Sequence, residues 1–473
     1  MIQNSSIRDA LTTVSATEAA ELIRQKELSP VELLDAYLQR IEQVEPAINA
    51  FADRCFDKAR RQARIAESAV LRRETDAPLL GVPVTVKSCL DVQGMRCEAG
   101  SLLRQGHVPT TDAAVVTLLR QAGAILVGNT CTPEMLMSYH TENRLYGRTN
   151  NPWDLGRSAG GSSGGEAAAI AAGMSAAGVG SDGGGSIRVP AHFCGICGLK
   201  PTPGRISSRG HFPSGLGPFS FIGVVGPMAR TIRDLQLLLR VLEGYDPGDA
   251  ASYPTEAMEN KKAMKSLKIG FFDDNGIATP VPEIREAVQT AATALSREGF
   301  YVEPFRPAWL MEACELWAGI FVDAGAALLH PMLMQHESET SDTLRDFLAL
   351  AGSRRPLTGE RLLKILVARD QLRLRALAEM EEFPVILSPV CSITAFQHGD
   401  GGWSENRPAY YLQTMTYSQP YNLLGAPAAV VPISNACGLP IGVQIAGRPY
   451  KDREVLAVAE VLDGIFGCKN PPL

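Results

Sequence analysis

Several features that would place a protein in a simple class are missing from this sequence. No run of about 18 uncharged apolar residues occurs, so no membrane span is expected. The first residues show neither the basic start nor the apolar centre of a secretory signal. A formal net charge of -6 over 473 residues gives no reason to expect nucleic acid or an anionic membrane as a direct partner. We therefore expect a cytoplasmic protein without a membrane span.

The cysteines and histidines also lack recognisable patterns. The ten cysteines stand at irregular intervals, and a chain of this length needs no disulfides, so a reducing compartment fits best. Cys194 and Cys197 have the spacing of a redox or zinc pair, but no second pair lies nearby, and we interpret them as packing residues. None of the seven histidines lies in a triad motif, so the usual base for a serine nucleophile is missing.

The composition is that of a globular protein with a large core, because 45% of the residues are hydrophobic and 20% are charged. Residues 81–87 and 124–130 read as strands on either side of a helix at 113–123, which is a βαβ pattern. We interpret the chain as one large α/β domain, residues 1–473. Its other predicted elements are N-terminal helices in 1–70 with capping patterns at Ser15 and Ser29, helices at 226–244 and 283–297, a mainly helical region at 307–380, and strands at 266–272, 385–390, 428–433 and 441–447.

Two glycine–serine clusters flank an alanine-rich helix between residues 156 and 201, inside a motif-rich segment at 79–250. Ser162 and Ser163 lie in the first cluster, and Ser186 directly follows three glycines in the second. Glycines let backbone N–H groups converge on a developing oxyanion, so this pattern is typical of an acyl-transfer nucleophile. The alternative interpretation is a tight packing element, because small residues also let backbones approach closely.

Lys87 is the candidate base for such a serine. It ends an apolar strand that contains Val82, Val84 and Val86, so its amine would be drawn toward the interior. Burial disfavours the ammonium form and lowers the pKa, and a neutral lysine can accept a proton. The alternative is a solvated charge at the end of a strand.

Three motifs, in this order, resemble the amidase signature family: GVPVTVK at 81–87, GGSSGGEAAAIAAG at 160–173 and GSDGGGSIRVPAHFCGICGLKPT at 180–202. Segments at 226–239, 417–432 and 438–460 are similar to family blocks as well, so the resemblance spans nearly the whole chain. It implies a central mixed, twisted β-sheet covered by helices on both faces. It also implies hydrolysis of a carbon–nitrogen bond through a Ser–cis-Ser–Lys triad, without metal or cofactor.

The resemblance assigns roles to individual residues. Ser186 matches the nucleophile, Ser162 matches the bridging serine with a cis peptide bond before it, and Lys87 matches the general base. The remaining matches are the oxyanion-hole N–H groups of Gly183, Gly184, Gly185 and Ser186, the supporting residue Ser163, and the bracing residues Asp182 and Arg188.

Two positions depart from the common family pattern. Gly183 stands where the family often has threonine, and the extra glycine could either loosen or widen the oxyanion loop. Glu166 stands where many members have serine. Members that act on long or bulky amides tend to share this form.

Two other motif matches carry less weight. Residues 160–164 satisfy the G-x-S-x-G pattern of α/β-hydrolases, but the polar segment before them does not read as the required strand. Gly178, Gly180 and Gly183 satisfy G-x-G-x-x-G, but they follow a helix, and Pro190 discourages the helix that a dinucleotide site needs.

The substrate is the least determined feature. We expect the helical region 307–380 to shape the acyl or leaving-group pocket. Its apolar residues are more often core than pocket, but any that line the site would favour an aryl amide, fatty amide or carbamate, as aryl acylamidases, fatty acid amide hydrolases and urethanases take. Arg354 and Arg355 could grip a carboxylate, although we favour a solvated basic pair.

The alternatives to a free-standing amidase are the glutaminase (A) subunit of a tRNA-dependent amidotransferase and a non-enzymatic scaffold. The oligomeric state stays open, with a homodimer as one option. The apolar residues of region 307–380 that could line the site are Trp309, Met311, Leu316, Trp317, Ile320, Phe321, Met332 and Met334.

Overall fold

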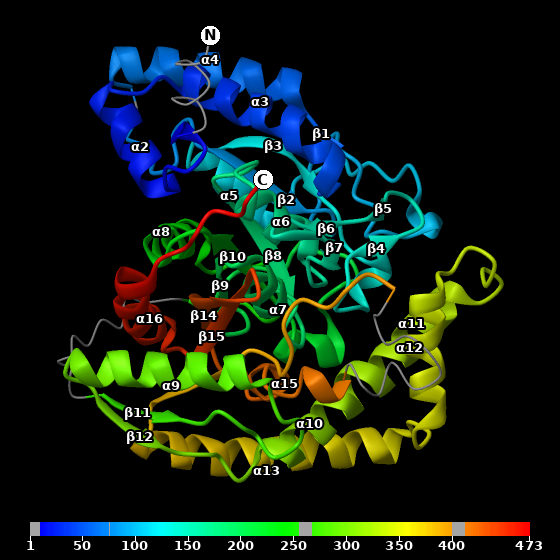
Figure 1. The fold of residues 1–473 in the computed structure, drawn as a ribbon. Coiled ribbons are helices and arrows are strands. Elements are labelled where there is room, and N and C mark those ends of the chain that lie inside the picture. The colour runs from blue at the N-terminus through cyan, green and yellow to red at the C-terminus, as the bar shows by residue number, and fades with distance from the viewer. Residues whose placement is uncertain (1–9, 75, 255–266, 400–411) are drawn as a thin grey trace.

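The computed structural model describes residues 10–74, 76–254, 267–399 and 412–473. Its centre is an 11-stranded sheet in the order β1-β3-β2-β8-β10-β9-β14-β15-β13-β11-β12 (Figure 1). The runs β3-β2-β8 and β13-β11-β12 are parallel and the other pairs are antiparallel, so the predicted mixed sheet is confirmed. Its strands are β1 (Phe51–Arg54), β2 (Pro83–Lys87), β3 (Ile125–Thr130), β8 (Ala177–Asp182), β9 (Cys197–Lys200), β10 (Val224–Ala229), β11 (Lys268–Phe271), β12 (Tyr301–Pro304), β13 (Val385–Pro389), β14 (Ala428–Ala436) and β15 (Leu439–Gly447).

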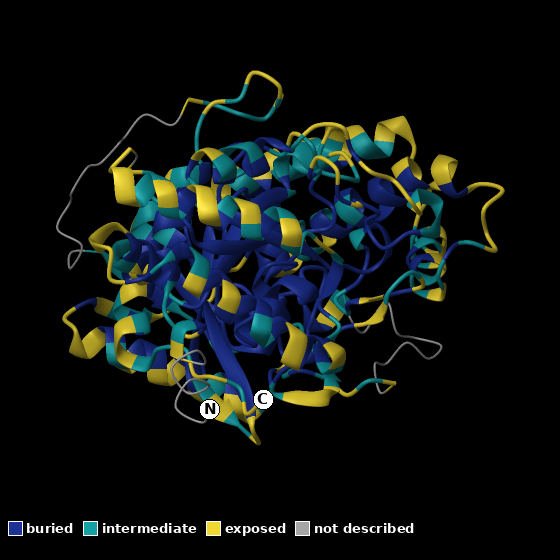
Figure 2. Ribbon diagram, turned by 90° about the horizontal axis from the view of Figure 1, so that it is seen from above, coloured by how far each residue is buried: buried dark blue, intermediate teal, exposed yellow. Residues whose placement is uncertain are grey.

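Helices cover both faces of this sheet, which is buried at the centre of the molecule (Figure 2). Two short ribbons lie outside it, β4 (Glu142–Asn143) with β5 (Gly147–Arg148) and β6 (Asn150–Asn151) with β7 (Asp154–Ser158). The helices are α2 (Ala16–Gln25), α3 (Pro30–Ile48), α4 (Phe56–Arg72), α5 (Ala114–Gln121), α6 (Gly164–Ala171), α7 (Arg188–Cys194), α8 (Ile232–Leu242), α9 (Pro282–Arg297), α10 (Leu310–Ala318), α11 (Gly325–Leu333), α12 (Asp342–Ser353), α13 (Gly359–Glu382), α15 (Gln419–Leu423) and α16 (Asp452–Phe466), with short helical turns η1 (Leu102–Arg104), η2 (Glu134–Leu136), η3 (Gly217–Phe221) and η5 (Gly319–Ala324).

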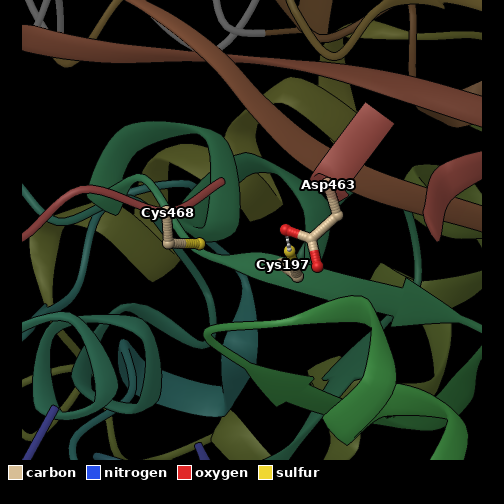
Figure 3. A group of neighbouring side chains, drawn as sticks. All are labelled: Cys197, Asp463 and Cys468. Atoms are coloured by element: carbon tan, nitrogen blue, oxygen red, sulfur yellow. Dashed lines mark hydrogen bonds between the residues drawn. The ribbon is translucent and has the colours of Figure 1, made fainter. Parts of the chain in front are cut away.

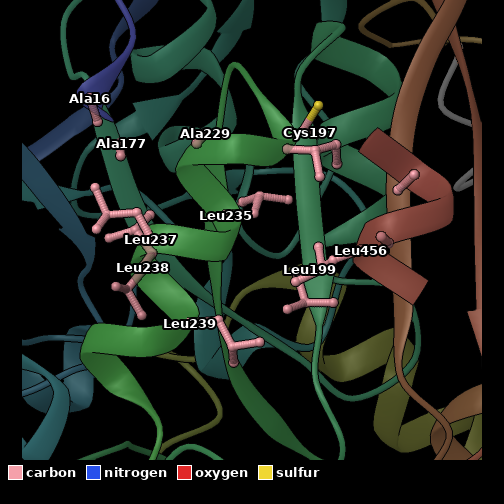
Figure 4. Close-up of a cluster of buried hydrophobic side chains, with 14 of the residues drawn as sticks. Ala16, Ala177, Cys197, Leu199, Ala229, Leu235, Leu237, Leu238, Leu239 and Leu456 are labelled. Carbon is pink, nitrogen blue, oxygen red and sulfur yellow. The ribbon is translucent and has the colours of Figure 1, made fainter. Parts of the chain in front are cut away.

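Successive side chains along a strand point to opposite faces of the sheet, and the buried clusters follow this alternation. Ala429 and Val431 of β14 join the cluster formed with α8, α9 and α16, whereas Ala428 and Val430 join clusters on the other side. Figure 4 shows α8 laying its leucines over β9 and β10 in the first of these clusters. Helices α6, α7, α10 and α15 contribute to the clusters of the second face.

Several predicted elements are confirmed. Strands β2 and β3 pair in parallel on either side of α5, which is the expected βαβ unit. Ser15 and Ser29 cap α2 and α3, because their hydroxyls accept hydrogen bonds from backbone N–H groups of the first turn.

The helix predicted at 226–244 is partly wrong. Residues 226–229 belong to β10, and α8 begins only at Ile232. The Thr231 hydroxyl accepts a hydrogen bond from the Asp234 N–H at 3.1 Å, which fixes this helix start. Pro227 lies within the strand part.

Strand β8 was not predicted, because glycine is rare in strands. A Cβ on Gly178 would lie 1.7 Å from a Glu166 side-chain oxygen, and a Cβ on Gly180 would lie 2.8 Å from Ser163 Oγ. Glycine is therefore required at both positions so that the segment leading into α6 can pack directly on the sheet.

Two of the structural reasons for discounting the other motif matches were wrong, although the glycines of G-x-G-x-x-G do follow a helix, α6. Pro190 lies in the first turn of α7, where a missing N–H leaves no intrahelical bond unmade. A strand, β7, does precede the G-x-S-x-G segment. However, β7 belongs to a two-stranded ribbon outside the central sheet, and Gly178 and Gly180 lie inside β8 rather than after it. Neither match has the geometry that its motif needs.

The most apolar helical segment lies at Leu310–Leu333. By length and composition it could cross a membrane, but 61% of its apolar window is buried inside the structure. Trp317 and Ile320 belong to a cluster with residues of α13 and α15.

Candidate active site

Lys87 is the fully buried last residue of β2. Its Nζ donates to Ser162 Oγ at 2.7 Å and to Ser181 Oγ at 3.1 Å. Burial lowers the pKa of Lys87 to about 8, although the nearby Cys89, Asp182 and Glu166 oppose this. A lysine with this pKa is partly neutral near pH 7 and can accept a proton, so the solvated-charge alternative does not apply.

Ser162 lies in the loop between β7 and α6. The peptide bond between Gly161 and Ser162 is cis, as the family resemblance implies. The Thr132 hydroxyl donates to the Ser162 carbonyl at 2.9 Å and holds the loop against the end of β3. Ser163 donates to the Ser181 carbonyl at 3.2 Å, so it ties the same loop to β8.

A buried ion pair between Asp182 and Arg188 holds the loop that carries Ser186. Arg188 contacts both oxygens of the Asp182 carboxylate at 3.0 Å. Burial alone would raise the pKa of Asp182, but Arg188 and Asn422 hold it well below its usual range. The carboxylate also accepts the N–H groups of Gly185 at 2.7 Å and Ile187 at 3.0 Å. Asp182 and Arg188 therefore brace the loop, as proposed from the sequence.

The backbone N–H groups of this loop alternate in direction. Those of Gly185 and Ile187 point to Asp182, whereas those of Gly184 and Ser186 have no acceptor among the described residues. The predicted oxyanion role of Gly185 is therefore not supported, because its N–H is already bound. Gly184 and Ser186 are the better donors for an oxyanion.

Two pockets meet at Ser186, which is 9% exposed. The first has an empty volume of about 570 Å³ and the second about 500 Å³. Both also share Leu136, Met137 and Phe321. The first pocket adds Ser162, Ser181, Asp182, Gly183, Ser208, His211, Pro213, Ser214, Gly215, Phe219, Gly223, Val224 and Val225, and the second adds Ser138, Tyr139, Gly184, Trp317, Phe347, Leu350 and Leu412.

This geometry agrees with the comparison to known proteins. The model of the Amidase family matches residues 32–456. The chain belongs to the amidase family. It is a hydrolase of carbon–nitrogen bonds with the fold of amidase signature enzymes.

Three relatives show the range of the family. The A-type subunit of glutamyl-tRNA(Gln) amidotransferase from Roseiflexus sp. (strain RS-1) is 35% identical over 95% of this amidase and 96% of its own length. Fatty-acid amide hydrolase 2 of Homo sapiens is 31% identical over 98% of this chain and 90% of its own. The crystal structure of a bacterial aryl acylamidase of the amidase signature family has a TM-score of 0.83 and 26% identity, and it covers 95% of this chain and 96% of that one.

The helical region 307–380 of the amidase divides between pocket, core and surface. Trp317 and Phe321 line the pockets, as the sequence suggested. Trp309 and Ile320 are buried in the core, whereas Leu316 packs at its edge. The methionines at 311, 332 and 334 are exposed. Sequence spacing did not separate these groups, because each turn of a helix meets a different neighbour.

Arg354 is neither a carboxylate grip for a ligand nor part of a solvated pair. Its Nε donates to the buried Asp323 at 2.8 Å, and Arg361 binds the other oxygen of the same carboxylate at 2.6 Å. This ion-pair group joins η5 to α13 and to the segment before it. The interpretation of Arg354 and Arg355 as a solvated pair is therefore wrong for Arg354.

Cys194 and Cys197 do not form a site together. The only group of potential metal ligands among the described residues is Cys197, Asp463 and Cys468, whose ligand atoms lie within 4.8 Å of one another (Figure 3). Both thiols donate to the Arg230 carbonyl, and Asp463 accepts the Ile232 N–H at 2.8 Å. These contacts explain the group as a tether for the end of α16, and none of its three residues lines either pocket.

Glu166 is a site residue whose role the sequence did not reveal. It lies on α6, fully buried, and accepts hydrogen bonds from the hydroxyls of Thr85 and Thr130. Burial raises its pKa to about 7, while both threonines and Lys87 lower it. Thr85 lies two positions before Lys87 on β2, so both side chains are on the same face of the strand. The Glu166 carboxylate, which binds Thr85, therefore lies near Lys87 and stabilises its ammonium form.

We expect Glu166→Gln to move the acid limb of the pH–rate profile to lower pH. The substitution keeps the size of the side chain but removes the negative charge that raises the pKa of Lys87. Neutral Lys87 would then persist at lower pH. Glu45→Gln is the matched control, because Glu45 is a buried carboxyl that binds the N–H groups of Ala50 and Phe51 instead. An unchanged profile, or a shift to higher pH, would show that Glu166 does not act on Lys87.

Proposed function

We propose that this amidase is a free-standing hydrolase of apolar amides, in the class of aryl amides, anilides, fatty amides and carbamates. The observation that supports this proposal is the lining of the two pockets that meet at Ser186. Among the described residues, the second pocket has no Arg, Lys, Asp or Glu in its lining. The first contains His211 and Asp182, and Arg188 already neutralises Asp182. An apolar group would be desolvated in the second pocket at little cost, whereas the charges of a glutamine backbone would lack partners there.

The proposed chemistry uses three side chains. Neutral Lys87 takes the proton of Ser162, with which it shares a 2.7 Å hydrogen bond. Ser162 takes the proton of Ser186, whose Oγ attacks the amide carbonyl, and both serines line the same pocket. The N–H groups of Gly184 and Ser186 stabilise the oxyanion, and Gly183 directly precedes them in the same loop.

The same relay then runs in reverse. Ser162 protonates the departing nitrogen, which would otherwise be a poor leaving group. Water attacks the acyl-enzyme on Ser186 and passes a proton through Ser162 to Lys87. As the bond to Ser186 Oγ breaks, this proton returns through Ser162 to Ser186, so the carboxylic acid leaves and both the serine hydroxyl and neutral Lys87 are restored. The reaction needs no group from outside the chain except the substrate and water.

A second candidate is the glutaminase component of a tRNA-dependent amidotransferase. The observation that favours it is the 35% identity to such a component over 95% of the chain. That function would require partner proteins and glutamine. The ten free cysteines fit a cytoplasmic location for either function.

Hydrolysis assays with the purified single chain separate the two candidates. We expect turnover of p-nitroacetanilide, an oleoyl amide or an aryl carbamate, and none of glutamine, because only the apolar groups match the pocket lining. The relative rates on the aryl and oleoyl members measure which substituent the pockets accept. Glutamine turnover alone, or no turnover of any of the four, would contradict the proposal and favour the amidotransferase component.

A further inference from the structure

The carbonyl groups of the Ser186 loop are bound by side chains from distant segments. Trp317 Nε1, on α10, donates to the Gly183 carbonyl at 2.8 Å. The Tyr139 hydroxyl, from the segment after η2, donates to the Gly184 carbonyl at 2.8 Å. Neither donor belongs to the motifs that carry the family resemblance.

These bonds fix the direction of the N–H groups on the same peptide units. A peptide unit is planar, and its N–H points opposite to its C=O. By holding the Gly183 carbonyl, Trp317 turns the Gly184 N–H to the other side, where it has no acceptor among the described residues. The next unit is held at both ends, by Tyr139 at its carbonyl and by Asp182 at the Gly185 N–H.

The aromatic rings also occupy the space that side chains on the loop would need. A Cβ on Gly183 would lie 2.8 Å from Phe321 Cε2, and a Cβ on Gly184 would lie 2.3 Å from Trp317 Cζ2. Trp317 and Phe321 stack with centroids 4.7 Å apart. The extra glycine at 183 therefore does not leave the loop loose, because Phe321 fills its place.

We propose that Trp317 and Tyr139 are positioning residues for the oxyanion hole. The inference rests on the proposed function and deepens it. Consecutive glycines have wide backbone freedom, so the loop needs outside donors to keep the Gly184 N–H aimed at the reacting carbonyl. Because Trp317 also walls the apolar pocket, one side chain joins substrate binding to stabilisation of the oxyanion.

The test compares Trp317→Phe and Tyr139→Phe with a matched control. Tyr139→Phe removes only the hydroxyl, whereas Trp317→Phe removes the indole N–H together with one ring of the side chain. Trp309→Phe is the control, because Trp309 is a buried tryptophan beside α10 whose Nε1 has no partner among the described residues. Direct loss of one oxyanion donor lowers kcat by about 10² to 10³. For loss of a positioning bond we expect kcat to fall about tenfold in both variants, with KM nearly unchanged in Tyr139→Phe, which leaves the pocket wall in place.

A second readout does not depend on the substrate. The rate at which an alkyl fluorophosphonate labels Ser186 should fall about tenfold in both variants and stay unchanged in Trp309→Phe, because the phosphoryl oxygen needs the same N–H groups. Equal labelling in all three variants, or a rise in KM with kcat intact, would overturn the inference. Failure of the wild type on the amide panel, with labelling still slowed in the two variants, would instead overturn only the proposed substrate class.

Discussion

Ser186→Ala is expected to abolish hydrolysis while leaving the fold intact. The Ser186 hydroxyl is the only proposed nucleophile, and loss of a nucleophile that acts with its base lowers kcat by about 10⁴ to 10⁶. The fold should not depend on this hydroxyl, because Asp182, Ser163 and the α7 backbone hold the loop through its main chain. The measurements are kcat on an apolar amide and the midpoint of thermal unfolding.

Ser214→Ala is the control for this experiment, since Ser214 lines the same pocket but takes no part in the relay. It should keep most of the wild-type activity. Rates in Ser186→Ala close to those of the wild type would remove Ser186 as the nucleophile. A large fall in the unfolding midpoint would mean that activity was lost through the fold.

Lys87→Met is expected to remove the acid limb of the pH–rate profile as well as most of the activity. The active form of Lys87 is the neutral one, so the wild-type rate should rise as pH increases through about 8, the pKa of Lys87. Methionine has a similar length and cannot take a proton, so the variant should show a low rate without this rise. We expect a loss on the order of 10³ or more, as for removal of other members of a relay.

Stability provides the internal control for Lys87→Met. The folded-state pKa of about 8 lies below the usual 10.5, so unfolded chains bind more protons between these values. Stability contributed by Lys87 is therefore lowest below about pH 8, where burial of the ammonium costs free energy. The variant should unfold no earlier than the wild type at pH 7. A pH–rate profile that keeps its rise near 8 would assign the base to another group.

Much of the fold was predictable because its local signals agree with its tertiary environment. The βαβ unit at 83–130 combines β-branched strands with a helix of regular spacing, and Ser15 and Ser29 mark helix starts through their own hydroxyls. Strand β8 was missed because Gly178 and Gly180 contradict strand propensity. Only the approach of α6 explains them, and that approach is a tertiary contact.

The site divides in the same way. The sequence by itself determined the residue types and their order: a lysine at the end of an apolar strand, a serine pair among glycines, and a serine after three glycines. These follow from local backbone demands, which leave a trace in the motif. The tertiary structure decided which N–H groups stay free, that Glu166 lies against the Lys87 network, and that Trp317 and Tyr139 hold the loop. The free N–H groups depend on how the loop folds around Asp182. The other features depend on hydrogen bonds and burial between segments far apart in the chain, and no short stretch of sequence encodes such distances.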